Sequence, residues 1–144
     1  MVLLFSPVPE FKICSTKIFK PNERHITRIY DKSVLILMVD GILKFRENGV
    51  DIELSSPQYY IQKQGLLQEG IYPSSGAKYF FIEFLGHFSQ NSSGIPLRGN
   101  FSMKNINPLI ERLEEQFKNH NADLFMLNSY MLRIFSALYT ENPV

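Results

Sequence analysis

The dipeptide Asn48-Gly49 constrains the fold of this chain more than any other short feature of its sequence. It separates two strand-like segments, ILKFRE at 42–47 and VDIEL at 50–54, and the second alternates strictly between apolar and polar residues. Asn-Gly favours the positive φ angles of a two-residue turn between antiparallel strands. The sequence therefore predicts a β-hairpin here, and with it an antiparallel β structure.

Similar segments surround this hairpin along roughly the first 90 residues. Turn signals recur about every 8–12 residues, which is typical of an antiparallel sandwich or barrel. Residues 33–39 are continuously apolar and rich in branched side chains, so they predict a strand buried on both faces. The other expected strands are residues 10–19, 25–30, 59–62 and 77–85, and residues 1–9, broken by two prolines, are expected to form an arm.

The pattern changes to helical after residue 95. Asn107 is expected to cap a first helix, with Pro108 at its first position and Asn119 and Asn121 near its end. A second helix is expected over roughly 122–140. Its apolar residues surround nearly the whole circumference, so it must be covered on more than one side.

We therefore divide the chain into a barrel with its N-terminal arm at 1–95 and a helical pair at 96–144. One interpretation of the second helix is a self-association surface that makes a homodimer. The alternative is that this helix lies in a groove of its own domain. The residues expected at the dimer surface are Leu124, Leu127, Met131 and Leu138.

Composition limits the classes of function. The 144 residues are 44% hydrophobic and 20% charged, as in one ordinary globular domain. The formal net charge is +1 and the basic residues are scattered, so no face for nucleic acid is visible. No apolar run approaches the ~20 residues of a membrane span. A single cysteine, Cys14, and the absence of a signal-peptide pattern favour a cytoplasmic location.

Motifs that carry out catalysis are missing from the sequence. There is no GxSxG, no P-loop and no dinucleotide-binding GxGxxG. His25, His87 and His120 lie far apart and are expected on the surface or in loops, although His87 follows a strand and suits a pocket mouth. Cys14 is expected in the core or a pocket. We therefore expect no enzyme activity, no metal and no cofactor.

The order of these features resembles the effector-binding domain of AraC-type transcription regulators over residues 34–88. Gly41 matches the glycine that ends the family's hydrophobic strand, and Ser56-Pro57-Gln58 stands at its Pro-Gly-Asp turn. The segment IQKQGLLQ at 61–68 occupies the place of the family's Pro-Pro-Gly loop, and YFFIEF at 79–84 matches its final aromatic strand.

The resemblance implies a mainly β fold with C-terminal helices, a cupin-like jelly-roll β-barrel followed by two α-helices. It also implies binding of a small effector, dimerisation through the helices, and a C-terminal helix-turn-helix domain that binds DNA. No such basic helix follows in this chain, so we expect the chain to be the regulatory part of a longer protein. Gln68 and Glu83 stand where the family often has histidine, which removes the usual metal ligands of a cupin.

Alternation along residues 79–84 predicts the pocket wall. Tyr79, Phe81 and Glu83 share one face, and aromatic faces beside a carboxylate are typical of sites for sugars. The family's pocket residues also lie on this face. We therefore expect a carbohydrate effector whose binding orders the N-terminal arm. The expected ligand-binding residues are Arg24, Arg28, Tyr60, Gln68, Tyr79, Phe81 and Glu83, with Tyr60 and Gln68 near the mouth.

Other interpretations stay open from the residues alone. Tyr79 and Phe81 also suit a plain core, Glu83 a structural ion pair, and Arg28 a solvent-facing position. A small cupin enzyme acting on a sugar needs a metal or an acid–base pair inside the barrel. A pure interaction module would have a filled barrel.

Overall fold

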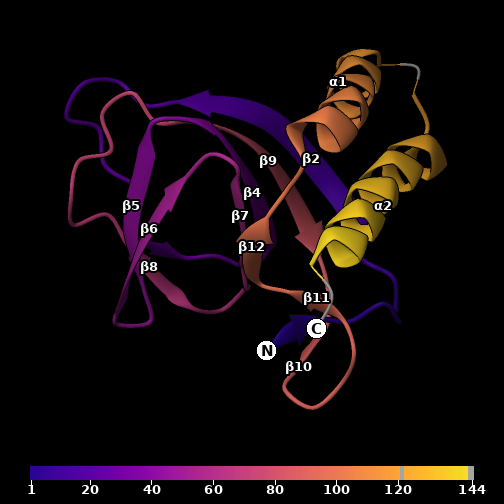
Figure 1. Cartoon of the computed structure of the whole chain (residues 1–144), viewed down its shortest axis with the longest axis horizontal. Helices are drawn as coiled ribbons and strands as arrows, with labels where there is room; N and C mark the ends of the chain where they lie inside the picture. Colours follow the sequence, from indigo (N-terminus) through magenta and orange to yellow (C-terminus); the bar gives the residue numbers. More distant parts are fainter. Residues whose placement is uncertain (121, 143–144) are drawn as a thin grey trace.

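The computed structural model describes residues 1–120 and 122–142. Asn121, expected near the end of the first helix, and the last two positions of the 96–144 segment lie outside the described residues. Strands form the first part of the chain and two helices follow (Figure 1). The elements are β1 (Val2–Leu3), β2 (Glu10–Ile18), β3 (Arg28–Ile29), β4 (Ser33–Asp40), β5 (Ile42–Glu47), β6 (Val50–Ser55), β7 (Gln58–Gln62), β8 (Leu67–Glu69), β9 (Lys78–Leu85), β10 (Phe88–Ser89), β11 (Ile95–Pro96), β12 (Arg98–Asn100), α1 (Met103–Lys118) and α2 (Leu124–Glu141).

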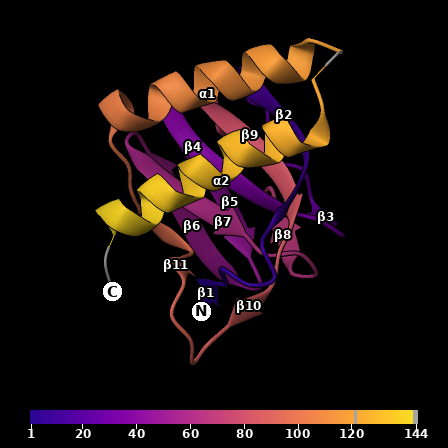
Figure 2. The ribbon, with the colours of Figure 1, turned by 90° about the vertical axis from the view of Figure 1, so that its right-hand side faces the viewer.

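Two antiparallel sheets make the body of the molecule. A five-stranded sheet has the order β12-β7-β4-β9-β2, and a four-stranded sheet has the order β3-β8-β5-β6. A small third sheet, β10-β1-β11, lies near the N-terminus. Helices α1 and α2 lie side by side over the five-stranded sheet, on the side away from β5, β6 and β8 (Figures 1 and 2).

The expected barrel is not closed. Among the described residues, no strand of the five-stranded sheet pairs with a strand of the four-stranded one. The strands at one side of the second sheet are very short, since β3 has two residues and β8 has three. Residues 25–30 therefore form much less strand than the sequence predicted, because most of that segment crosses between the sheets as a loop.

The hairpin at Asn48-Gly49 is confirmed. Asn48 has a φ of 48° and Gly49 a φ of 85°, and Glu47 pairs with Val50 across the turn. Both turn residues thus occupy the left-handed region that Asn-Gly tolerates best.

Strand β4 is buried on both faces, as its composition predicted. Leu35 and Leu37 face the helices, whereas Ile36 and Met38 face the second sheet. All four are at most 1% exposed. Because successive side chains point to opposite sides of a sheet, this one strand contributes to two separate apolar clusters.

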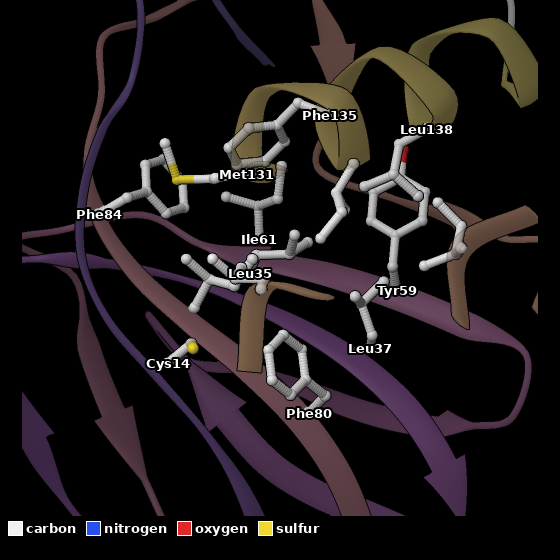
Figure 3. Close-up of a cluster of buried hydrophobic side chains, with 14 of the residues drawn as sticks. Cys14, Leu35, Leu37, Tyr59, Ile61, Phe80, Phe84, Met131, Phe135 and Leu138 are labelled. Atoms are coloured by element: carbon white, nitrogen blue, oxygen red, sulfur yellow. The ribbon is translucent and has the colours of Figure 1, made fainter. Parts of the chain in front are cut away.

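Helix α2 packs on the five-stranded sheet with most of the residues that the sequence assigned to a dimer surface. Leu127 is 8% exposed, and Met131 and Leu138 are fully buried beside Leu35, Ile61 and Phe84 (Figure 3). The prediction that these three residues form a free self-association surface is therefore wrong. The sheet needs an apolar cover, and α2 supplies it within the chain. Leu124, at 54% exposure, lies outside this contact.

Helix α1 begins five residues earlier than predicted. Ser102 caps it by accepting a hydrogen bond from the Asn105 backbone N–H, and Pro108 lies inside the helix. The earlier start lets Ile106 join the core, where it is fully buried. Pro108 is exposed, and it costs the hydrogen bond to the carbonyl four residues before it.

The N-terminal arm is built into the fold. Leu3 is fully buried in β1, the Leu4 N–H donates to the His87 carbonyl at 2.8 Å, and Phe5 contacts Tyr139 edge-on. Residues 3–5 thus pack on the rest of the chain, and the ordering of this arm by a ligand stays a prediction. Among the described residues, no helix is long and apolar enough to cross a membrane.

Candidate functional site

A cavity of about 320 Å³ lies between the two main sheets. The segment from Phe19 to Thr27 forms one side of it, because this segment carries the chain from β2 in the first sheet to β3 in the second. The opposite wall is β9. The cavity thus lies where the strands do not close the barrel.

Strand β9 separates this cavity from the helices. Tyr79, Phe81 and Glu83 line the cavity, as their alternation predicted. Phe80 and Phe84 point the other way into the core beneath the helices. Phe81 remains partly exposed, and its ring meets Tyr79 at a centroid distance of 6.1 Å. An aromatic surface is therefore available inside the cavity.

Arg28, Tyr30 and Glu83 form a connected set at this wall. The Arg28 guanidinium lies 3.7 Å from the centre of the Tyr30 ring, and the Tyr30 hydroxyl donates to Glu83 Oε1. Burial, followed by this hydrogen bond, raises the pKa of Tyr30 to about 12, so the hydroxyl keeps its proton. Tyr30 was not predicted, although its place between Arg28 and the buried β4 strand is visible in the sequence.

Arg24 and Arg28 both line the cavity, and neither lies within 4.0 Å of a carboxylate oxygen in the described chain. The buried Nε of Arg28 has no hydrogen-bond partner there. By contrast, Lys17 pairs with Glu23 at 2.6 Å on the rim. The hydrogen bond from Lys17 holds the pKa of Glu23 below its usual value. The two arginines are thus the unpaired cations of the site.

His25 is a residue of the cavity that the sequence did not predict. It is 5% exposed, stacks on Phe45 at 5.0 Å, and bonds the Ile26 carbonyl through Nδ1 and the Gln62 amide through Nε2. A neutral ring protonated on Nδ1 satisfies both contacts, because it donates to the carbonyl and accepts from Gln62 Nε2. Burial, and secondarily the charge of Arg28, lowers its pKa, so the ring is neutral near pH 7.

Two of the predicted ligand residues lie elsewhere. Tyr60 is 8% exposed and donates to Glu47 Oε1 at 2.8 Å, and Gln68 is 2% exposed and donates to Glu47 Oε2. Neither lines the cavity mouth. Glu47 has no cationic partner in the described chain, and the neutral side chains of Tyr60 and Gln68 are its hydrogen-bond donors. Burial raises the pKa of Glu47. The sequence analysis placed Tyr60 and Gln68 near the mouth, but the sequence gives no depth for either residue.

The lining of the cavity offers guanidinium donors, the carboxylates of Glu23 and Glu83, the Gln62 amide and aromatic surface. Such groups can bind a polar ligand. Within residues 1–120 and 122–142, no three His, Cys, Asp or Glu side chains are grouped as metal ligands. Cys14 lies in the core on the helix side, where burial raises its pKa to about 12 and keeps the thiol protonated.

The comparisons with known proteins bear on the fold alone. No family model matches the chain, and no curated protein matches it. Among solved structures, the protein YhaK from Escherichia coli, a cupin-fold protein, matches with a TM-score of 0.50 at 12% identity. The match covers 71% of this chain and 48% of YhaK, so the chain spans about half the length of that protein. The chain is therefore cupin-like in fold, with an open barrel followed by two helices.

Proposed function

We propose that this chain is a sensing domain that binds a small hydroxylated molecule, of the sugar class, in the cavity between the sheets. One observation carries the proposal: unpaired arginines, the Glu83 carboxylate and the partly exposed Phe81 ring meet in one cavity. Sugars are held by stacking on aromatic rings and by hydrogen bonds to charged or amide groups. In this proposal the chain is the regulatory part of an AraC-type transcription regulator, with DNA binding left to a separate domain.

Strand β9 offers a route for the signal. Phe81 and Glu83 would contact the ligand, whereas Phe84 on the other face meets Phe135 of α2 at a centroid distance of 5.1 Å. A shift of this strand on ligand binding would therefore move the packing of α2. A ligand can shift such an equilibrium only by its different affinity for the two states.

We further propose that two copies associate through the outer face of α2. Phe125, Ser129, Leu132 and Ser136 are spaced by four, three and four residues, which is the repeat of a helix–helix seam. Phe125 is 91% exposed, and a groove of about 440 Å³ runs beside these residues. Large and small side chains alternate along the seam, so an antiparallel second copy would fit large residues against the serines.

The ligand proposal is tested by a thermal-shift screen of neutral sugars and sugar acids, followed by calorimetry. A ligand at free concentration L that binds the native state stabilises it by RT ln(1 + L/Kd), so it raises the melting temperature. We expect Phe81→Ala and Glu83→Gln to abolish binding of the compounds found, while Phe125→Ala, far from the cavity, leaves it intact. If Phe81→Ala and Glu83→Gln both bind the compounds as tightly as the wild type, the ligand-binding site lies outside this cavity.

The dimer proposal is tested by sedimentation. Phe125→Lys and Leu132→Lys should yield monomers, and Arg112→Glu on the exposed side of α1 should not. A wild type that sediments as a monomer at tens of micromolar, a concentration at which a micromolar dimer is well populated, contradicts the proposal.

A further inference from the structure

We propose that the ligand of this cavity carries a carboxylate as well as hydroxyls, as in a hexuronic acid, and that Arg28 binds the carboxylate. The inference rests on the proposed sensing function and narrows its ligand from sugars in general to acidic sugars. It follows from the way charges are paired and left unpaired around the cavity.

Arg28 is held in place without an acceptor. Its guanidinium is fixed against the Tyr30 ring at 3.7 Å, and its buried Nε bonds to nothing in the described chain. A buried donor without a partner destabilises the free protein. A carboxylate is the acceptor that matches a guanidinium best, because two parallel N–H···O bonds form at once.

The remaining charges near the cavity do not supply that acceptor. Glu23 is engaged by Lys17, and Glu83 accepts from the Tyr30 hydroxyl without lying within 4.0 Å of either cavity arginine. His25 is kept neutral by its burial. With Lys17 and Glu23 cancelling, two guanidiniums stand against one carboxylate, and this balance favours an anionic ligand.

The rest of the cavity determines what else the ligand must carry. Glu83 accepts hydrogen bonds, so it selects hydroxyls that donate. Phe81 is partly exposed and offers apolar ring surface for one face of a sugar ring, beside the largely buried Tyr79. A volume of about 320 Å³ lies at the small end of the range for ligand pockets, which suits a single ring. A monosaccharide with one carboxylate meets all three conditions.

Matched pairs of compounds test the inference. Glucuronate and galacturonate differ from glucose and galactose only at C6, where a carboxylate replaces the CH2OH group, so calorimetry on each pair measures the effect of that exchange. We expect the acids to bind at least about 10-fold more tightly than the neutral sugars, since hydrogen bonds to charged groups contribute more than neutral ones. Arg28→Gln should remove this difference, and Arg28→Lys should restore part of it.

Two further variants separate the role of Arg28 from folding. Tyr30→Phe keeps the ring beneath Arg28 but frees Glu83, so we expect the preference for acids to remain. Lys104→Gln removes one positive charge from the exposed start of α1, and it should change neither affinity nor preference. Thermal melts of all variants verify that the fold is retained.

The outcomes are distinguishable. Neutral sugars that bind as tightly as the acids overturn the carboxylate inference and leave the sensing proposal standing. Acids that keep their advantage in Arg28→Gln overturn the role of Arg28. If neither acids nor neutral sugars bind the wild type, the inference fails together with the sugar class of the sensing proposal.

Discussion

The two faces of the five-stranded sheet differ in what they bury. Toward the helices the sheet presents Leu35, Phe80 and Phe84, which share one buried apolar cluster with residues of α1 and α2 (Figure 3). Toward the second sheet, apolar side chains such as Ile36 mix with buried polar ones such as Glu83. Apolar side chains fill most of the space between the first face and the helices. On the second face, polar groups and an unclosed barrel edge keep a cavity open.

This difference teaches that one strand can serve stability and binding at once. Burial of large apolar groups stabilises the helix side, whereas the cavity side retains polar groups that the fold would be more stable without. Such groups are typical of binding sites. We therefore expect substitutions on the helix side of β9 to lower stability, and substitutions on its cavity side to lower ligand binding.

The largest expected effect lies on the helix side. Phe84→Ala removes a fully buried ring that packs on Phe135, so the free energy of unfolding should fall by about 3–5 kcal/mol. Phe81→Ala, on the other face of the same strand, should cost less than about 2 kcal/mol because that ring is partly exposed. Urea unfolding followed by circular dichroism measures both. Equal losses would erase the distinction between the two faces.

An intermediate effect is expected in the polar interior. Tyr60→Phe removes the hydroxyl that donates to buried Glu47 and leaves Gln68 as its donor. The free energy of unfolding should fall by about 1–3 kcal/mol. Tyr72→Phe is the matched control, since Tyr72 is 45% exposed and should change stability by less than about 0.5 kcal/mol. If Tyr60→Phe leaves the free energy of unfolding unchanged, the stability of the protein does not depend on the hydrogen bond from Tyr60 to Glu47.

The smallest effect is the pH dependence due to His25. Its pKa is lower in the native protein than the usual 6.5, so the unfolded chain binds more protons. The contribution of His25 to the free energy of unfolding is therefore fully present above about pH 6.5. It is lost as the pH falls through 6.5 toward the native pKa, by at most about 1.4 kcal/mol per pH unit. His25→Gln should flatten this loss in urea titrations at about pH 7.5 and about pH 5.5.

Glu47 works in the opposite direction and must be separated from His25. Burial raises the pKa of Glu47 above the usual 4.5. Its contribution to the free energy of unfolding is therefore greatest below pH 4.5 and declines as the pH rises toward the native pKa. The His25→Gln comparison keeps Glu47 in both proteins, so the difference between their pH profiles reports His25. Parallel profiles would contradict a neutral buried histidine.

Local patterns predicted the longer strands well because their signals act over a few residues, whereas the strands of two or three residues were missed. The Asn48-Gly49 turn, the doubly buried β4 and the two faces of β9 all follow from the alternation of side chains and from turn chemistry. The start of α1 was missed because Asn107-Pro108 is a good helix start by itself. Tertiary burial of Ile106 favours an earlier turn, capped by Ser102.

The candidate site was predictable only in part for a similar reason. Alternation assigned Tyr79, Phe81 and Glu83 to one face, but it gave no depth for Tyr60 and no interior place for His25. Depth depends on how far apart two sheets lie, which no local pattern encodes.

The sequence by itself determined the longer strands, the two helices, the hairpin and the inward face of β9, since these depend on residues close together in the chain. Only the tertiary structure decided that Met131 of α2 belongs to the core of its own chain, and that Arg28 lies on Tyr30 without an acceptor. The physical reason is that burial and charge pairing depend on neighbours that are distant in sequence and meet only in the folded molecule.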